Sequence, residues 1–273
     1  MKGRGLRRTG FALAGPLPLV AQHPRLAVVA EPPAAATLVG HAPAVMDQGQ
    51  TSGCEGHGWA VGITTHCAAI GDPLGFVASP ASIYTPARCV ERATFPTGPA
   101  EPLGDNGTDS PAVIEALGSY GVRSIAAPTP DGRYSDITPE NVNAEPRLDE
   151  LEAADHTRLV GAYALPADQA GRIAAIRACI AAGVPVIIET FVDSAYEALG
   201  PGVVVDHCDP TDRNGGGHCQ VILAYRTTAA GATECLVRNS WGIGWADEGA
   251  AWATERFVGE AWSLYAVDVR RAQ

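Results

Sequence analysis

The residue best suited to covalent chemistry in this chain of 273 residues is a cysteine that follows a glycine-containing turn. Residues 47–54 read Asp-Gln-Gly-Gln-Thr-Ser-Gly-Cys, and apolar residues then recur at helical spacing as far as Ile70. Cys54 is therefore expected at the start of a helix, where unpaired N–H groups and the helix dipole favour negative charge. That setting lowers the pKa of a thiol and so favours the thiolate, which is the nucleophilic form. The N–H of Cys54 and the side-chain NH2 of Gln48 are donors suited to hold an oxyanion.

Two segments near the far end of the chain carry a histidine and an asparagine. His218 follows three glycines and opens the apolar run Cys-Gln-Val-Ile-Leu-Ala-Tyr, and residues 239–245 read Asn-Ser-Trp-Gly-Ile-Gly-Trp. Together with Cys54, these segments resemble the papain family of cysteine peptidases, in which a Gln precedes the Cys, a His opens a strand and an Asn-Ser-Trp-Gly run follows. The order Cys, His, Asn also matches, and the resemblance covers roughly residues 30–269.

The resemblance implies a role for each matching position. Cys54 would be the nucleophile, His218 the general base and acid, and Asn239 the residue that orients the imidazole. The resemblance also implies that Gln48 donates to the oxyanion and that Gly107 and Trp241 lie beside the substrate.

These roles agree with elementary chemistry. We expect Nδ1–H of His218 to donate to the Asn239 carboxamide, which would fix the tautomer and aim Nε2 at the Cys54 sulfur. Because asparagine is neutral, it orients the ring without adding a charge, and Trp241 would shield the hydrogen bond between them. The thiolate–imidazolium pair can then attack a peptide carbonyl, form an acyl-enzyme and release it to water.

Two positions depart from the family pattern. Thr51 stands where the family has the first cysteine of a structural disulfide, and Glu55 replaces the aromatic residue after the nucleophile. An acid in the first helical turn suits the helix dipole, but it predicts an unusual rim to the site. The pattern is closest to bacterial members that lack a long inhibitory propeptide, so we expect any latency to have another origin.

Other histidines compete for the role of base. His57 lies one helical turn after Cys54, where a histidine more often packs or faces solvent, and His207 has Asp206 and Asp209 as neighbours. Four Cys–His proximities also suggest a structural zinc site, but adjacent residues on a strand point to opposite faces and cannot easily share one ion. We therefore expect no metal and no cofactor. The four proximities are Cys54/His57, His66/Cys67, His207/Cys208 and His218/Cys219.

Helical patterns dominate the first half of the chain and strand patterns the second. That segregation indicates an α+β fold instead of alternating strands and helices. With the resemblance, it predicts a two-lobed papain-like fold, in which a helical lobe (roughly residues 45–125) carries the nucleophile and a β-rich, barrel-like lobe (roughly residues 160–270) carries the histidine and asparagine. Expected helices span residues 54–70, 79–88, 110–120 and 166–182, expected strands span 184–192, 203–205, 219–225, 235–238, 250–254 and 264–269, and expected loops span 90–108 and 123–156.

The composition argues against several classes of protein. The net charge of −11 and the pI near 5.0 repel phosphate backbones, so no nucleic-acid partner is expected. No apolar run reaches the roughly 18 residues of a membrane span. The seven cysteines are odd in number, widely spaced and without a CxxC pair, which favours mostly reduced thiols over a disulfide scaffold.

The beginning of the chain loosely resembles an export signal. Residues 1–8 are basic and residues 9–21 are mostly apolar. However, Pro16 and Pro18 interrupt the apolar run, and no clean cleavage site follows. We therefore favour a cytoplasmic protein over an exported one, with residues 1–30 as a leader or loosely attached segment and residues 31–273 as the peptidase domain.

The sequence thus predicts a cysteine-type peptidase, and specifically an endopeptidase, that hydrolyses peptide or protein substrates through an acyl-enzyme on Cys54. Two alternatives stay open. A catalytically weak member would only bind peptides or proteins, as Glu55 and the missing disulfide suggest. A peptide ligase would pass the acyl group to an amine in place of water.

Overall fold

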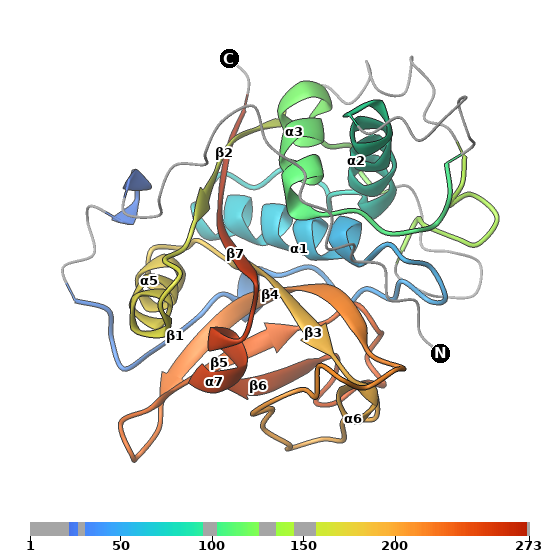
Figure 1. Ribbon diagram of the computed structural model, residues 1–273. Helices are drawn as coiled ribbons and strands as arrows, with labels where there is room; N and C mark the ends of the chain where they lie inside the picture. Colours follow the sequence, from blue (N-terminus) through green and yellow to red (C-terminus); the bar gives the residue numbers. More distant parts are fainter. Residues whose placement is uncertain (1–21, 27–30, 95–102, 126–134, 145–156, 272–273) are drawn as a thin grey trace.

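The computed structural model of the chain describes residues 22–26, 31–94, 103–125, 135–144 and 157–271 (Figure 1). Three helices gather on one side, namely α1 (Cys54–Ala69), α2 (Pro80–Thr94) and α3 (Ser110–Tyr120). Figure 1 shows α1 between a β-sheet on the other side and the pair α2 and α3. Among the helices of the described residues, none is long and apolar enough to cross a membrane.

The sheet has seven strands, and all pairings between its named strands are antiparallel. Its order is β2-β7-β3-β4-β5-β6, with β1 beside β4. The strands are β1 (Ala35–Thr37), β2 (Thr157–Ala164), β3 (Val186–Val192), β4 (Gly216–Thr227), β5 (Thr233–Arg238), β6 (Ala250–Thr254) and β7 (Ser263–Arg271). The remaining helical elements are η3 (Val39–His41), α5 (Gln169–Ala181), α6 (Ser194–Glu197) and α7 (Glu255–Gly259).

Helix α1 is buried along most of its length, and its glycines make this burial possible. A Cβ at Gly56 would lie 2.5 Å from the Pro80 carbonyl oxygen of α2, and one at Gly58 would lie 2.8 Å from the Cys219 sulfur of β4. Glycine costs about 1 kcal/mol relative to alanine in a helix interior. The close approach to α2 and β4 explains why the chain accepts this cost within one helix.

The two faces of β3 belong to two hydrophobic cores. Ile187 packs in the core that includes Trp59 of α1 and Leu117 of α3, whereas Val186 packs in the core that includes Ile176 of α5. This division follows from strand geometry, because successive side chains point to opposite faces. The sheet therefore separates the helical side from a second core beneath α5 and α7.

The structure confirms most expected elements and corrects others. The helices expected at residues 54–70 and 110–120 are present almost to the residue as α1 and α3. Helix α2 continues to Thr94, so the loop expected from residue 90 is wrong there, because Val90 still packs on the core. Helix α5 begins at Gln169 and not at residue 166, since the Asp168 side chain accepts from Gly171 N as its N-cap.

Two strand assignments also differ from the sequence-based expectation. The strand expected at residues 203–205 is wrong, because only Val205 pairs, in an isolated bridge with Ala253. Strand β2 was not expected, and its register with β7 shifts between Leu159 and Gly161. An edge strand interrupted by a glycine shows little alternation, so its pairing with β7 defines it more than its sequence does.

Candidate active site

Cys54 is the first residue of α1, and Gly53 is its N-cap without a side-chain hydrogen bond. A helix N-terminus leaves its first N–H groups without intrahelical partners, so this end of α1 offers donors beside the thiol. The Cys54 side chain has no exposed surface. One turn further, Gly58 lies against Cys219, the sequence neighbour of His218. The packing of α1 on β4 therefore brings the helix of Cys54 to the strand of His218.

His218 lies near the start of β4, and Asn239 directly follows the neighbouring strand β5. His218 Nε2 lies 2.7 Å from Asn239 Oδ1, in a hydrogen bond that both buried side chains share. The expected nitrogen was Nδ1, and this expectation is wrong. Nε2 is the ring nitrogen farther from the backbone, so it is the one that reaches across to the end of β5.

The Asn239 carboxamide is itself held in place. Its Oδ1 also accepts the backbone N–H of Ser240 at 2.7 Å, and the backbone N–H of Asn239 donates to the Gly249 carbonyl at 2.9 Å. The Ser240 N–H fixes the side-chain oxygen and the Gly249 carbonyl fixes the backbone, so the carboxamide presents its oxygen to the imidazole in one orientation. The ring therefore keeps Nε2 protonated as long as it is neutral.

Trp241 covers the imidazole. Its ring stacks on His218 with centroids 4.6 Å apart and an interplanar angle of 28°, and its side chain is 1% exposed. On its other sides it meets Tyr196 and Trp245 in edge-on contacts. The expected shielding of the histidine by Trp241 fits this packing, whereas the expected contact of Trp241 with substrate stays a prediction.

Gln48 connects the cysteine turn to the asparagine loop. Its backbone N–H donates to the Ser240 carbonyl at 2.9 Å, and its Oε1 accepts Ser240 Oγ at 2.6 Å. Its Nε2 donates to the Thr51 carbonyl at 2.8 Å. The amide is thus oriented with its oxygen towards Ser240 and its nitrogen towards the turn that leads to Cys54. This orientation is the one that an oxyanion donor requires.

Gly107 lies in a turn beside the cysteine segment. Its φ is 80°, a conformation that favours glycine, and its N–H donates to the Tyr84 hydroxyl at 3.1 Å. The neighbouring Asp105 accepts Ser52 N through both carboxylate oxygens, at 3.0 and 2.9 Å. The structure thus brings the turn of Gly107 to the turn of Cys54, and its expected contact with substrate stays a prediction.

The sequence led us to expect Glu55 at the rim of the site, and this expectation is wrong. It is fully buried, and its Oε2 accepts Trp59 Nε1 at 3.1 Å and Ser110 Oγ at 3.0 Å. Burial first, and then the nearby carboxyl of Glu189, raise the pKa of Glu55 well above its usual value. The side chain points inwards because α3 and β3 provide polar partners on that side of α1. Sequence alone offers no signal for this direction.

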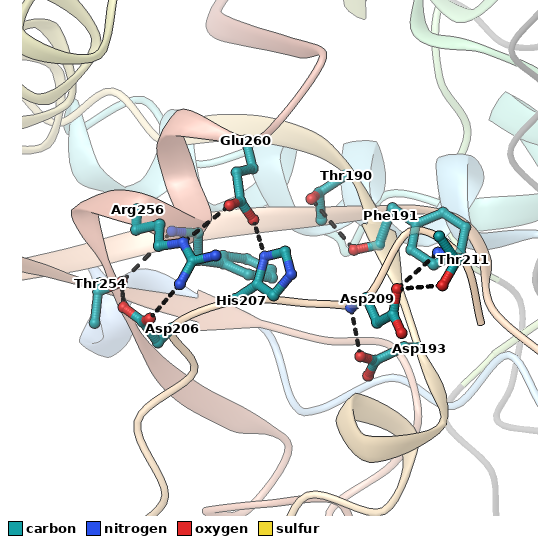
Figure 2. A network of polar contacts seen from close by, with 11 residues as sticks. Thr190, Phe191, Asp193, Asp206, His207, Asp209, Thr211, Thr254, Arg256 and Glu260 are labelled. Atoms are coloured by element: carbon teal, nitrogen blue, oxygen red, sulfur yellow. Dashed lines mark hydrogen bonds and ion pairs between the residues drawn. The ribbon is translucent and has the colours of Figure 1, made fainter.

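The two competing histidines have structural partners of their own. His57 Nδ1 lies 2.7 Å from the Gly53 carbonyl and its Nε2 lies 2.8 Å from Ser135 Oγ, so both ring nitrogens are engaged. His207 is exposed, and its Nδ1 lies 2.6 Å from Glu260 Oε2, within a surface network that Arg256 continues (Figure 2). Neither arrangement is that of a base beside Cys54. Among the described residues, no three His, Cys, Asp or Glu side chains gather as a metal site would require.

No protein-family model and no curated protein matches the sequence, but solved structures match nearly the whole chain. Xylellain, a cysteine protease from Xylella fastidiosa, is similar with a TM-score of 0.71 and 19% identity, covering 98% of this chain and 96% of its own. A procathepsin B from Trypanosoma congolense follows at 0.67 and 14%, covering 99% and 87%. The bromelain protease from Ananas comosus is similar at 0.57 and 15%, covering 86% and 98%.

These similarities define the class of fold. The chain has the two-lobed α+β papain-like fold that the sequence predicted, and the solved structures that share it are cysteine proteases. At identities of 14% to 19% the likeness is one of fold. What the chain does with this fold has to be argued from its own site.

Proposed function

We propose that the chain is a cysteine-type peptidase that cleaves peptide bonds through an acyl-enzyme on Cys54. The observation that carries this proposal is the hydrogen bond of 2.7 Å between His218 Nε2 and Asn239 Oδ1, covered by Trp241. An imidazole fixed in this way has one nitrogen oriented by a neutral amide and the other available for proton transfer. Its strand packs against the helix that Cys54 opens.

The chemistry then follows from the positions of these groups. The Cys54 proton passes to His218 Nδ1, and the helix N-terminus favours the resulting thiolate. The sulfur attacks the substrate carbonyl carbon, and Cys54 N–H and Gln48 Nε2 donate to the oxyanion. The C–N bond breaks as His218 returns the proton to the leaving amine. Water then attacks the thioester, with His218 as base, and the acid product leaves.

The alternative of a weak peptide-binding module loses one of its two supports. It rested partly on an acidic rim formed by Glu55, whereas that side chain is buried among Trp59, Ser110 and Glu189. A peptide ligase would use the same acyl-enzyme with an amine as acceptor, so only the products distinguish it from a hydrolase.

Hydrolysis of a peptide library tests the proposal. The peptides should be blocked at both ends, because cleavage of blocked peptides also identifies an endopeptidase, which is the type that we propose. We expect cleavage by the wild type and by Cys89→Ser, a control at a partly exposed thiol on α2, but none by Cys54→Ser. Added amines that appear in the products would indicate ligation. Cleavage by Cys54→Ser at the wild-type rate would contradict the proposal.

A further inference from the structure

Two buried carboxyl groups meet directly behind the proposed nucleophile. Glu55 follows Cys54 in α1 and is 0% exposed, and Glu189 lies on β3 and is 2% exposed. Both carboxyls bind Ser110, whose N–H donates to Glu189 Oε1 at 2.8 Å and whose Oγ donates to Glu55 Oε2 at 3.0 Å, so they lie close together and repel each other when both are charged. Two buried carboxyl groups at such close quarters favour a state in which one of them keeps its proton. The chain therefore keeps a titratable pair beside the sulfur, and the proposed mechanism does not use it.

The hydrogen bonds of the pair indicate where this proton lies. Glu55 Oε2 accepts from Trp59 Nε1 and from Ser110 Oγ. Glu189 Oε1 accepts Ser110 N at 2.8 Å, and its Oε2 accepts Ser263 Oγ. Within the described residues, no N–H or O–H donor reaches Glu55 Oε1, and the neighbouring thiol of Cys219 is only a weak donor to Glu55. A proton on Oε1 that is donated to Glu189 would satisfy this oxygen, since a buried polar atom without a partner is costly.

The pair joins the two sides of the molecule at the site. Glu55 and Ser110 belong to helices α1 and α3, whereas Glu189 and Ser263 belong to strands β3 and β7. In the register of β3 with β4, Glu189 is opposite Cys219, and the next residue is opposite His218. The shared proton is therefore one residue from Cys54 on the helix and one register position from His218 on the sheet.

We propose that Glu55 and Glu189 share one proton and act as a positioning pair, which holds the helix of Cys54 against the strand of His218. This inference rests on the proposed peptidase function. The pair also limits the negative charge beside the thiolate, because with one proton it carries a single charge. Loss of that proton as the pH rises would leave two adjacent carboxylates behind the sulfur. They would repel each other across the lobe boundary and disfavour the thiolate.

The groups that face the pair also favour its protonated form. Cys54 on α1 and Cys219 on β4 lie close enough to interact with Glu55, and Tyr265 on β7 interacts with both carboxyls and with Asp109 at the start of α3. Each of these groups is neutral or negative, and none of them offers a positive charge. Burial and the neighbouring carboxyl raise the pKa of Glu55 well above its usual value, so its proton is held to a higher pH than that of an exposed glutamate.

Glu55→Gln tests the inference, because glutamine keeps an oxygen for Trp59 and Ser110 and an NH2 for Glu189 but cannot lose the proton. The quantity to measure is kcat/KM against pH, with each variant scaled to its own value at pH 6. One pH unit above the midpoint of the alkaline limb, the wild type should retain about a tenth of its plateau. We expect Glu55→Gln to retain at least threefold more at that pH. Glu115→Gln, on the exposed face of α3, is the matched control and should follow the wild type.

Two readouts that need no peptide substrate separate this inference from the proposed function. The first is the rate at which a thiol reagent alkylates Cys54 against pH, and the second is the midpoint of thermal unfolding against pH. Because the pKa of Glu55 is raised in the folded state, stability is lost as the pH rises from the unfolded value of about 4.5 towards the folded one, so wild type and Glu115→Gln should lose more stability than Glu55→Gln as the pH rises through that range. If Glu55→Gln and wild type show superimposable profiles in all three measurements, the inference is overturned, whether or not peptides are cleaved. If only the peptides remain uncut, the positioning pair stands and the peptidase function fails.

Discussion

Gln48 and Ser240 are joined by two hydrogen bonds across the site, one between backbones at 2.9 Å and one from Ser240 Oγ to Gln48 Oε1 at 2.6 Å. The residue before Ser240 accepts from His218, and Gln48 belongs to the turn that ends at Cys54. Ser240 thus connects the orientation of Gln48, the proposed oxyanion donor, to the loop that holds His218, the proposed base. The segments of the site are therefore interdependent, and substitutions outside the reacting groups are expected to affect activity.

The first prediction concerns Ser240→Ala. Removal of the hydroxyl takes away the partner of Gln48 Oε1, so the amide is held less firmly, by its Nε2 hydrogen bond to the Thr51 carbonyl, while the backbone hydrogen bond to Ser240 persists. We expect kcat/KM to fall on the order of tenfold, less than the 10² to 10³ that loss of an oxyanion donor costs. The loss should appear mainly in kcat, with KM little changed. Ser119→Ala, at an exposed position of α3, is the control. An unchanged kcat in Ser240→Ala would show that this hydroxyl does not orient Gln48.

The second prediction concerns the tryptophan over the imidazole. Trp241 is 1% exposed and packs on His218, Tyr196 and Trp245. Trp241→Ala would leave a large cavity, so we expect a loss of about 3–5 kcal/mol in the free energy of unfolding. Trp241→Phe keeps an aromatic face over the ring and should lose less. Denaturant unfolding measures both, and equal losses in the two variants would speak against a role for stacking.

The third prediction uses two glycines with opposite surroundings. A Cβ at Gly58 would lie 2.8 Å from the Cys219 sulfur, whereas one at Gly118 meets nothing within 4 Å. Gly58→Ala should push α1 from β4 and destabilise the protein by about 1–3 kcal/mol. Gly118→Ala should instead stabilise α3 by up to about 1 kcal/mol, because glycine is costly in a helix interior. Thermal unfolding of the two variants measures both changes in stability. An unchanged stability of Gly58→Ala would contradict the tight contact between α1 and β4.

The fourth prediction concerns acid stability. Burial lowers the pKa of His66 from 6.5 to about 4, against the opposing effects of the Gly183 carbonyl and Asp268. Because the folded pKa is below the unfolded value, stability is lost as the pH falls from 6.5 to 4, on the order of 3 kcal/mol in total. His66→Gln keeps a donor for the Gly183 carbonyl and should be less sensitive to acid over that range. The exposed His41→Gln should behave as the wild type, and equal acid sensitivity in all three proteins would rule out His66 as the cause.

The sequence correctly predicted the residues whose positions depend on short local motifs. A glycine turn followed by helical spacing predicted that Cys54 opens α1, and the glycines before His218 predicted that it lies near the start of a strand. The Asn-Ser-Trp-Gly run predicted the residue that meets the imidazole, and the structure shows this contact at 2.7 Å. Each of these features depends on a short stretch of chain and on general rules for helix and strand ends.

What sequence could not assign depends on contacts between distant segments. Which nitrogen of His218 faces Asn239 follows from the spacing of β4 and β5, and we expected the wrong one. Glu55 appeared to be a rim residue, because nothing near it in sequence reveals Ser110 and Glu189 as partners. Strand β2 likewise exists through its pairing with β7. In each case a partner at least 21 residues away in the sequence decides the outcome.

The central claim is that Cys54 is a nucleophile activated by His218, and mass spectrometry after treatment with a thiol-directed peptidyl epoxide tests it most directly. We predict one adduct per chain, located on Cys54, formed much faster than with a small free thiol and lost in His218→Ala. Cys89→Ser should be labelled as the wild type is. Labelling of Cys54 at the rate of a small free thiol, or unchanged labelling in His218→Ala, would contradict the account.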